Sequence, residues 1–393
     1  ILFAVNYPFD LYTVPTFLAS FAMITLGVYL CSRASRLFSP SEALMISLCR
    51  VAIFAIYFFF WEHSTALSDD RNYVGTGYRH MDDFSDRILS IRCRYQFLCG
   101  LMMSFLGPLY TTPVTFNIVL SAIIALICQK MGTFLMGENT RLSRRFFLFC
   151  LFHPELLAYS SYAFKDIWVV TALILSLYSI QKFLCREFIL SGLFLWGSLW
   201  YLQEGRKYTP YIIIAALGLS FLWNVCKKLK TKSLYLIPFC LLYLNDRISR
   251  SSGLTYFALA YWHSYFLYLT PGEMRTYTLK IISENALRSF GVIAPPQMPI
   301  LFVWYNLVMF LFLPIGIYLF IKNNVQKTFA ACVIIYSGIT LAVMCMGLET
   351  ITSGRHHMQY FFIKVLCQFL VFFWLKDKSQ SFIQGKHLLA KRS

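Results

Sequence analysis

Residues 112–131, TPVTFNIVLSAIIALICQKM, form an apolar run that carries one charged side chain, Lys130. A helix needs roughly 17 to 25 mainly apolar residues to cross a bilayer, so this run predicts a transmembrane helix. The composition agrees, because 58% of the 393 residues are hydrophobic, 18% are aromatic and only 13% are charged. Soluble globular domains carry about 25% charged residues. The sequence therefore predicts an all-α membrane protein.

The same criterion finds about eleven candidate spans along the chain. They predict a polytopic transmembrane helical bundle, with residues 1–393 forming a single transmembrane domain and no separate soluble domain. The chain opens at Ile1 without a basic segment ahead of a cleavable apolar stretch, so no signal peptide is expected, and one further helix before it would make twelve. The predicted spans cover residues 11–31, 43–61, 112–131, 145–160, 166–183, 188–202, 209–225, 234–245, 300–321, 328–347 and 359–375.

The net charge of +17 reports topology rather than nucleic-acid binding. When alternate loops are assigned to opposite sides, one side collects 20 of the 35 Lys and Arg residues and four of the 18 acids. Such an excess of Lys and Arg marks cytoplasmic loops, and no basic face interleaved with aromatic residues stands out for base stacking. We therefore expect a multi-pass protein of the cytoplasmic (inner) membrane, surrounded by membrane lipids and without a nucleic-acid partner.

Two predicted outer loops are long, at 62–111 and 246–299, and both contain amphipathic stretches. In the first, Ile88, Ile91, Tyr95 and Leu98 recur at helical spacing. In the second, residues 273–290 carry an apolar stripe beside a ladder of charges spaced four residues apart. Helices of this kind suit the membrane interface.

An acidic pair stands in the first of these loops, in the stretch SDDRNYVGTGY at 68–78. Asp69 and Asp70 follow directly after a predicted span, and Tyr73 lies close behind as a candidate for substrate binding. Two adjacent carboxylates could hold a divalent cation, Mg or Mn, or one could act as a general base while the other orients it. The alternative, an ordinary solvated loop, explains these residues equally well when they are taken alone.

A second polar group interrupts the apolar stretch FHPELLAYSSYAFKDIWVV at 152–170. His153, Pro154 and Glu155 break one predicted span, and Lys165 and Asp166 stand at the mouth of the next. Charges at such depth are costly unless they are paired or face a wet cavity, which favours a functional role. The alternative is that Lys165 and Asp166 anchor the helix end at the interface, where an acid is favourable at a helix N-terminus.

Two short outer turns carry cations. QEGRKYTPY at 203–211 contains Arg206 and Lys207, and TSGRHHMQY at 352–360 contains Arg355 and His356, with Lys364 about one turn inside the last span. Arg and Lys beside lipid can bind a phosphate headgroup through charge-assisted hydrogen bonds. The alternative for Lys364, and for Arg50 in the second span, is a side chain that snorkels to the interface.

All four polar groups fall on the side opposite to the basic excess, which predicts one polar cavity that opens outward. Cations there could hold the phosphate leaving group of a lipid carrier, while a carboxylate deprotonates an incoming hydroxyl.

An acidic pair in an early outer loop, the segment P-x4-YSSYAFKD at 154–166 and an Arg on a short outer turn together resemble the GT-C superfamily of integral membrane glycosyltransferases, which includes aminoarabinose transferases and relatives of protein O-mannosyltransferases. The resemblance implies an enzyme that moves a sugar from a polyprenyl-phosphate carrier to a lipid or glycan acceptor outside the cytoplasmic membrane, with inversion at the anomeric carbon. It further implies that Asp69 or Asp70 is the base or the metal-contacting acid, and that Lys165, Arg206 and Arg355 contact the phosphate.

Two other functions remain open. A polymerase or ligase of O-antigen or capsule repeat units would use polyprenyl-pyrophosphate donors and would depend on loop 246–299 and on the Arg and His residues of 352–360. A lipid-linked sugar transporter or flippase would show pseudo-symmetric halves and broken helices near the membrane midplane, and the sequence contains no internal repeat.

Overall fold

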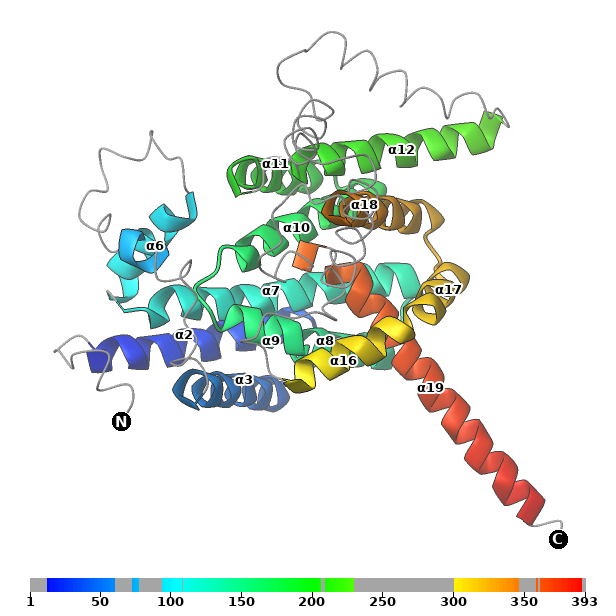
Figure 1. Cartoon of the computed structure of the whole chain (residues 1–393), viewed down its shortest axis with the longest axis horizontal. Coiled ribbons are helices and arrows are strands. Elements are labelled where there is room, and N and C mark those ends of the chain that lie inside the picture. Colours follow the sequence, from blue (N-terminus) through cyan, green and yellow to red (C-terminus); the bar gives the residue numbers. More distant parts are fainter. Residues whose placement is uncertain are drawn as a thin grey trace, which may run out of the picture.

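The structure is a computed structural model that describes residues 13–60, 73–77, 94–107, 109–205, 209–229, 300–345, 358–359 and 361–390. Every regular element in these ranges is helical (Figure 1). The all-α prediction is therefore confirmed for the described residues. The labelled helices are α2 (Thr13–Ala34), α3 (Pro40–Phe60), α6 (Arg94–Leu106), α7 (Thr111–Met136), α8 (Thr140–Leu151), α9 (Pro154–Ser160), α10 (Asp166–Leu184), α11 (Phe188–Gly205), α12 (Thr209–Leu229), α16 (Ile300–Leu311), α17 (Leu313–Asn323), α18 (Lys327–Cys345) and α19 (Phe361–Ala390).

Three of these helices are long and apolar enough to cross a membrane, over Pro15–Ala34, Thr111–Met136 and Asp166–Leu184. The bent pair Tyr305–Leu311 and Leu313–Asn323 makes a fourth if it is counted as one span. Several shorter apolar helices accompany them. The membrane character that the composition predicts is thus supported, whereas the number of eleven or twelve spans stays a prediction, and the candidate span 234–245 lies outside the described residues.

Two predicted spans are interrupted, and proline explains both interruptions. The predicted span 145–160 consists of α8 and α9, separated at Phe152 and His153, where His153 is extended with φ −61° and ψ 128°. A residue before proline is pushed out of the helical region, and Pro154 follows here. The predicted span 300–321 bends by 57° between α16 and α17, because Pro314 has no N–H to donate to the preceding turn.

Helix α7 is the centre of the bundle. It packs against α2, α6, α8, α9 and α10 (Figure 1), and most of its side chains are buried. Close approach is possible because small residues face the contacts: a Cβ on Gly27 of α2 would stand 2.8 Å from the Val119 side chain. By contrast, α11 directs large apolar side chains such as Ile189 and Trp196 away from the protein, as expected for a helix with a lipid-facing surface.

Basic residues of distant segments meet near the loops that join α2 to α3, α7 to α8 and α10 to α11. Arg144 at the start of α8 pairs with Glu42 at the start of α3, and Lys130 interacts electrostatically with Lys182 and Arg36. All three loops belong to the basic side that the sequence predicts, and these contacts are consistent with that prediction.

Candidate functional site

The polar segment at 152–166 lies against the middle and the N-terminal part of α7. Helix α8 ends at Leu151, the short α9 runs over Pro154–Ser160, and α10 begins at Asp166 (Figure 1). The sequence predicted that His153, Pro154 and Glu155 interrupt an apolar run, and the break between α8 and α9 confirms this. At both ends of α9, backbone and side-chain polar groups therefore lie inside an apolar bundle. These groups need hydrogen-bond partners from neighbouring helices.

Asn117 of α7 supplies partners to the turn between α9 and α10. Its Nδ2 donates to the carbonyl oxygens of Tyr162 at 2.7 Å and Phe164 at 3.1 Å, and its Oδ1 accepts from the indole Nε1 of Trp168 at 2.9 Å. Asn117 is fully buried. One side chain thus holds the chain on both sides of Lys165 and Asp166, at Tyr162 and Phe164 before them and at Trp168 after them.

Glu155 and Lys364 form a buried ion pair between the first turn of α9 and the first turn of α19. The Lys364 ammonium donates to Glu155 Oε1, and the side chains are 5% and 0% exposed, respectively. Snorkelling is therefore the wrong interpretation of Lys364, because its ammonium turns inward to a carboxylate. Both residues were predicted cavity residues, and the structure brings them together across 209 positions of sequence.

A second contact between the same elements lies one helical turn away. His153 Nε2 is 2.8 Å from Gln368 Oε1, and the Tyr305 hydroxyl of α16 is 3.2 Å from His153 Nε2 and 3.3 Å from Gln368 Oε1. Because Gln368 Oε1 can only accept, His153 carries its proton on Nε2 in this arrangement. The rings of Phe149, Tyr305 and Phe361 stand edge-on around the imidazole.

Arg50 of α3 is fully buried as well. Its Nη2 donates to the hydroxyls of Ser160 in α9 at 2.7 Å and of Ser121 in α7 at 3.1 Å. The snorkelling interpretation of Arg50 is wrong, because the guanidinium stays inside the bundle. The basic side chain instead links α3 and α7 to the end of α9.

The remaining predicted site residues divide into those that the structure describes and those that it does not. Tyr73 lies in a helical turn at 73–77, and its ring meets Tyr95 of α6 edge-on with 5.2 Å between centroids. Trp168, two residues past Asp166, packs on the same small cluster. Asp166 is buried and Lys165 is half-buried. Predicted residues outside the described ranges are Asp69, Asp70, Arg206, Lys207, Arg355 and His356.

The stripe of Tyr95 and Leu98 that the sequence predicts falls on α6, where Tyr95, Cys99 and Met102 form a buried cluster. Residues Arg94–Leu106 are thus helical, whereas the amphipathic, interfacial character of this stretch stays a prediction. The second predicted amphipathic stretch, 273–290, lies outside the described residues.

No group of three or more His, Cys, Asp or Glu side chains within the described ranges could hold a metal ion. The residues predicted to hold Mg or Mn, Asp69 and Asp70, lie outside these ranges. The described cysteines are free thiols.

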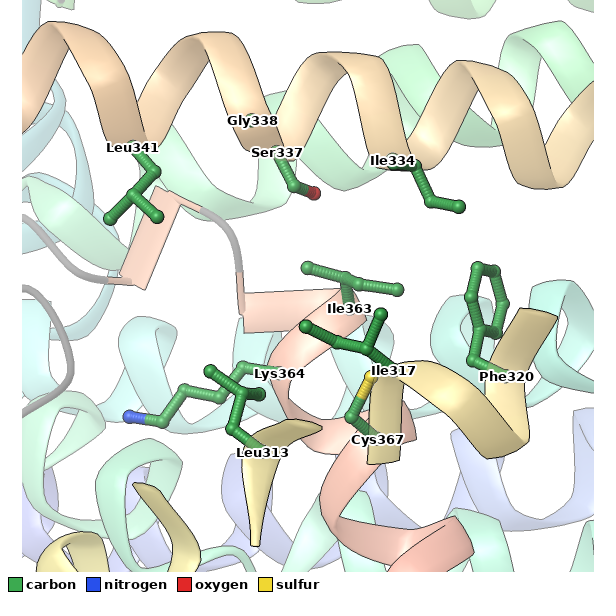
Figure 2. A pocket seen from close by; sticks show the side chains of 10 residues that line it. All are labelled: Leu313, Ile317, Phe320, Ile334, Ser337, Gly338, Leu341, Ile363, Lys364 and Cys367. Carbon is green, nitrogen blue, oxygen red and sulfur yellow. The ribbon is translucent and has the colours of Figure 1, made fainter. Parts of the chain in front are cut away.

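An apolar crevice adjoins the ion pair. It has a volume of about 200 Å³ and lies between α17, α18 and α19, with Lys364 in its wall (Figure 2). The stem of Lys364 borders the crevice, whereas its ammonium points away from Ile317 and Ile363. A cation, a carboxylate and an apolar crevice thus occupy one region of the bundle.

Family models, curated proteins and solved structures offer no match to this chain.

Sequence reasoning missed Asn117, Gln368 and Tyr305. Gln368 had a detectable pattern, because it follows Lys364 by four residues and both therefore lie on one face of the last span. No sequence pattern distinguished Tyr305, since interfacial Tyr is common in membrane proteins for reasons unrelated to catalysis.

Proposed function

We propose that the chain is an integral membrane glycosyltransferase that takes a sugar from a polyprenyl-phosphate carrier, as the resemblance in its sequence implies. The observation that supports this proposal best is the buried pair of Glu155 and Lys364 beside an apolar crevice. Ionisable residues inside a membrane bundle are rare and usually functional. A cation that can hold phosphate and an apolar crevice that can take hydrocarbon are two of the parts that transfer from a lipid phosphate requires.

In the proposed reaction the oxygen of the acceptor hydroxyl bonds to the anomeric carbon of the sugar, and the bond from that carbon to the phosphate oxygen breaks. The phosphate leaves with the bonding electrons and is held by cations, for which Lys165, Arg206, Arg355 and Lys364 are the proposed residues. The hydroxyl proton passes to Asp69 or Asp70. These two acids are also the ones that would hold Mg²⁺ or Mn²⁺, which would offset charge on the phosphate. The proposed location is the cytoplasmic membrane, with the site facing outward.

The proposal is tested with purified protein in proteoliposomes that contain a polyprenyl-phosphate-linked radiolabelled sugar and candidate lipid or glycan acceptors. We expect release of polyprenyl phosphate together with a labelled covalent product. The double variant Asp69→Asn/Asp70→Asn should lower the rate by about 100-fold or more, the usual contribution of a general base. The matched control is Asp82→Asn/Asp83→Asn, a second acid pair of the same predicted loop. Full activity of the first variant would contradict the proposed roles of Asp69 and Asp70.

One observation favours a second candidate, a transporter of a lipid-linked sugar. The break at 152–153 lies next to buried charged and polar groups, and discontinuous helices of this kind form the binding sites of many transporters. The two candidates differ in product. Flux of the lipid-linked sugar across vesicles without a covalent product would support transport and contradict glycosyl transfer.

A further inference from the structure

The crevice between α17, α18 and α19 exists because these helices pack on different neighbours. Helix α18 packs mainly on α12, whereas α17 packs on α19. Gly316 allows α17 to approach α19 closely, since a Cβ at Gly316 would stand 2.8 Å from Cys367 Cβ. The space left beside α18 is the crevice, and Figure 2 shows Ile334, Gly338 and Leu341 of α18 facing α17 and α19 across it.

The chemistry of the crevice wall selects a hydrocarbon occupant. Its lining is apolar apart from Ser337 and Lys364, and the Ser337 hydroxyl already donates to the Val333 carbonyl at 2.7 Å. Ile317 and Ile334 are 41% and 38% exposed, so the crevice opens to the surroundings of the bundle. A volume of about 200 Å³ holds roughly seven water-sized groups. That is room for a segment of one chain.

Lys364 connects this slot to the charged site. Its methylene stem lines the slot, and its ammonium lies beyond the wall on Glu155. A chain that occupies the crevice therefore brings its headgroup toward a cation that is held by a carboxylate when no lipid is bound. A phosphate carries at least as much charge as a carboxylate and offers more acceptor oxygens, so it can compete for the ammonium.

We infer that the crevice receives the single hydrocarbon chain of the phosphate lipid, and that the lipid phosphate takes the Lys364 ammonium from Glu155. The identity of the lipid as the sugar carrier rests on the proposed function. The exchange adds to that function an entry path between α17, α18 and α19 and a step in which lipid binding releases the Glu155 carboxylate.

The chain-binding half of the inference is tested by photocrosslinking. The full-length protein in nanodiscs is labelled with a polyprenyl phosphate that carries a diazirine in its chain, and the labelled residues are mapped by mass spectrometry. We expect labelling of α17 to α19 along the crevice. Gly338→Leu should reduce this labelling at least fivefold, because its side chain projects into the slot and its Cβ meets no atom within 4 Å.

The matched control is Gly218→Leu in α12. A Cβ there also meets nothing within 4 Å, and Gly218 is not among the residues that line the crevice. This variant should label as the wild type does. Equal loss in both variants, or labelling of wild-type protein elsewhere but not along the crevice, would overturn the proposed location.

The headgroup half is tested by the thermal stability of two variants. Glu155→Gln leaves the Lys364 charge without its carboxylate, and Lys364→Met leaves the Glu155 charge without its ammonium. Both should unfold at lower temperature than the wild type. Added polyprenyl phosphate should restore at least half of the loss in Glu155→Gln beyond the effect of uncharged polyprenol, because the phosphate replaces the missing carboxylate, and in Lys364→Met it should restore no more than polyprenol does.

Uncharged polyprenol serves as the comparison ligand, because its chain can occupy the crevice without bringing a phosphate, and it should stabilise both variants to the same extent. A rescue by polyprenyl phosphate that exceeds the rescue by polyprenol in both variants, or in neither, would overturn the exchange. Neither experiment contains a sugar or measures transfer. If both lipid experiments give the expected results but no glycosyl transfer is found, the proposed enzyme is refuted and the lipid site stands. If transfer is found but the lipid experiments fail, the lipid site alone is refuted.

Discussion

Replacement of Asn117 by Leu tests whether one side chain holds the turn that carries Lys165 and Asp166. Leu has a similar size, so the variant removes four hydrogen bonds from a fully buried position without opening a large cavity: three of 2.7 to 3.1 Å and one of 3.5 Å to the Tyr95 hydroxyl. Each bond contributes about 1 kcal/mol, and a buried donor left without a partner costs about 1–3 kcal/mol. The indole N–H of Trp168 becomes such a donor. We expect a loss of about 3 kcal/mol or more.

The assay is equilibrium unfolding of the purified protein in detergent, followed by tryptophan fluorescence and circular dichroism. Asn324→Leu is the matched control, because the Asn324 amide, one residue past the end of α17, donates to the carbonyls of Phe320 and Ile321 in the last turn of that helix and lies at a partly exposed position. The control should lose less than about 1 kcal/mol. If Asn117→Leu loses no more than the control, Asn117 does not organise the turn, and the reasoning about the site fails.

Three further predictions concern the bundle around the site. Arg50→Met should leave stability unchanged or raise it, because no carboxylate among the described residues pairs with the buried guanidinium; a loss above about 2 kcal/mol in the same unfolding assay would show that its hydroxyl partners are essential. The pKa of Glu42 is lowered to about 2 by the Ser39 N–H and by Arg144. Because the folded-state pKa lies below the ordinary 4.5, its stabilisation is present above that pH and is lost as the pH falls toward 2. Glu42→Gln should thus lower the melting temperature at pH 7 and not at pH 2, and an equal decrease at both would refute the assignment. Gly132→Ala should cost about 1–3 kcal/mol, because its Cβ would collide with Phe146, whereas Gly197→Ala, with open space around the Cβ, should not destabilise; comparable unfolding midpoints for the two would contradict the tight contact of α7 with α8.

Much of the helical architecture follows from apolar length and proline. The predicted spans 112–131 and 166–183 correspond closely to α7 and α10, because a long apolar run has no other way to satisfy its backbone in lipid. Hydropathy averages over a window of about 19 residues and therefore joins α8 to α9 and α16 to α17. Pro154 and Pro314 were the local indicators of both breaks.

The site was predictable in part. Glu155 and Lys364 could be singled out, because a charge within an apolar run needs an explanation. Their pairing could not be predicted, since it depends on how α19 packs against α9, and 209 residues separate the two partners. Nor could Ser121 and Ser160 be recognised from the sequence as the hydrogen-bond partners of Arg50, because Ser is common in transmembrane helices for packing reasons alone.

The energetics of the ion pair argue for a role beyond stability. Replacing a buried pair by well-packed apolar residues is often neutral or stabilising by about 1–4 kcal/mol, so stability alone does not explain Glu155 and Lys364. Nor does specificity require charge here, because the bond between His153 and Gln368, one turn further along α19, already fixes how that helix meets the break before α9. In the proposed exchange, the ion pair supplies a cation and a carboxylate that separate when the lipid phosphate binds. A pair that serves only architecture would gain nothing from lying at the wall of an open apolar crevice, whereas a pair that exchanges partners with a lipid phosphate has to lie there.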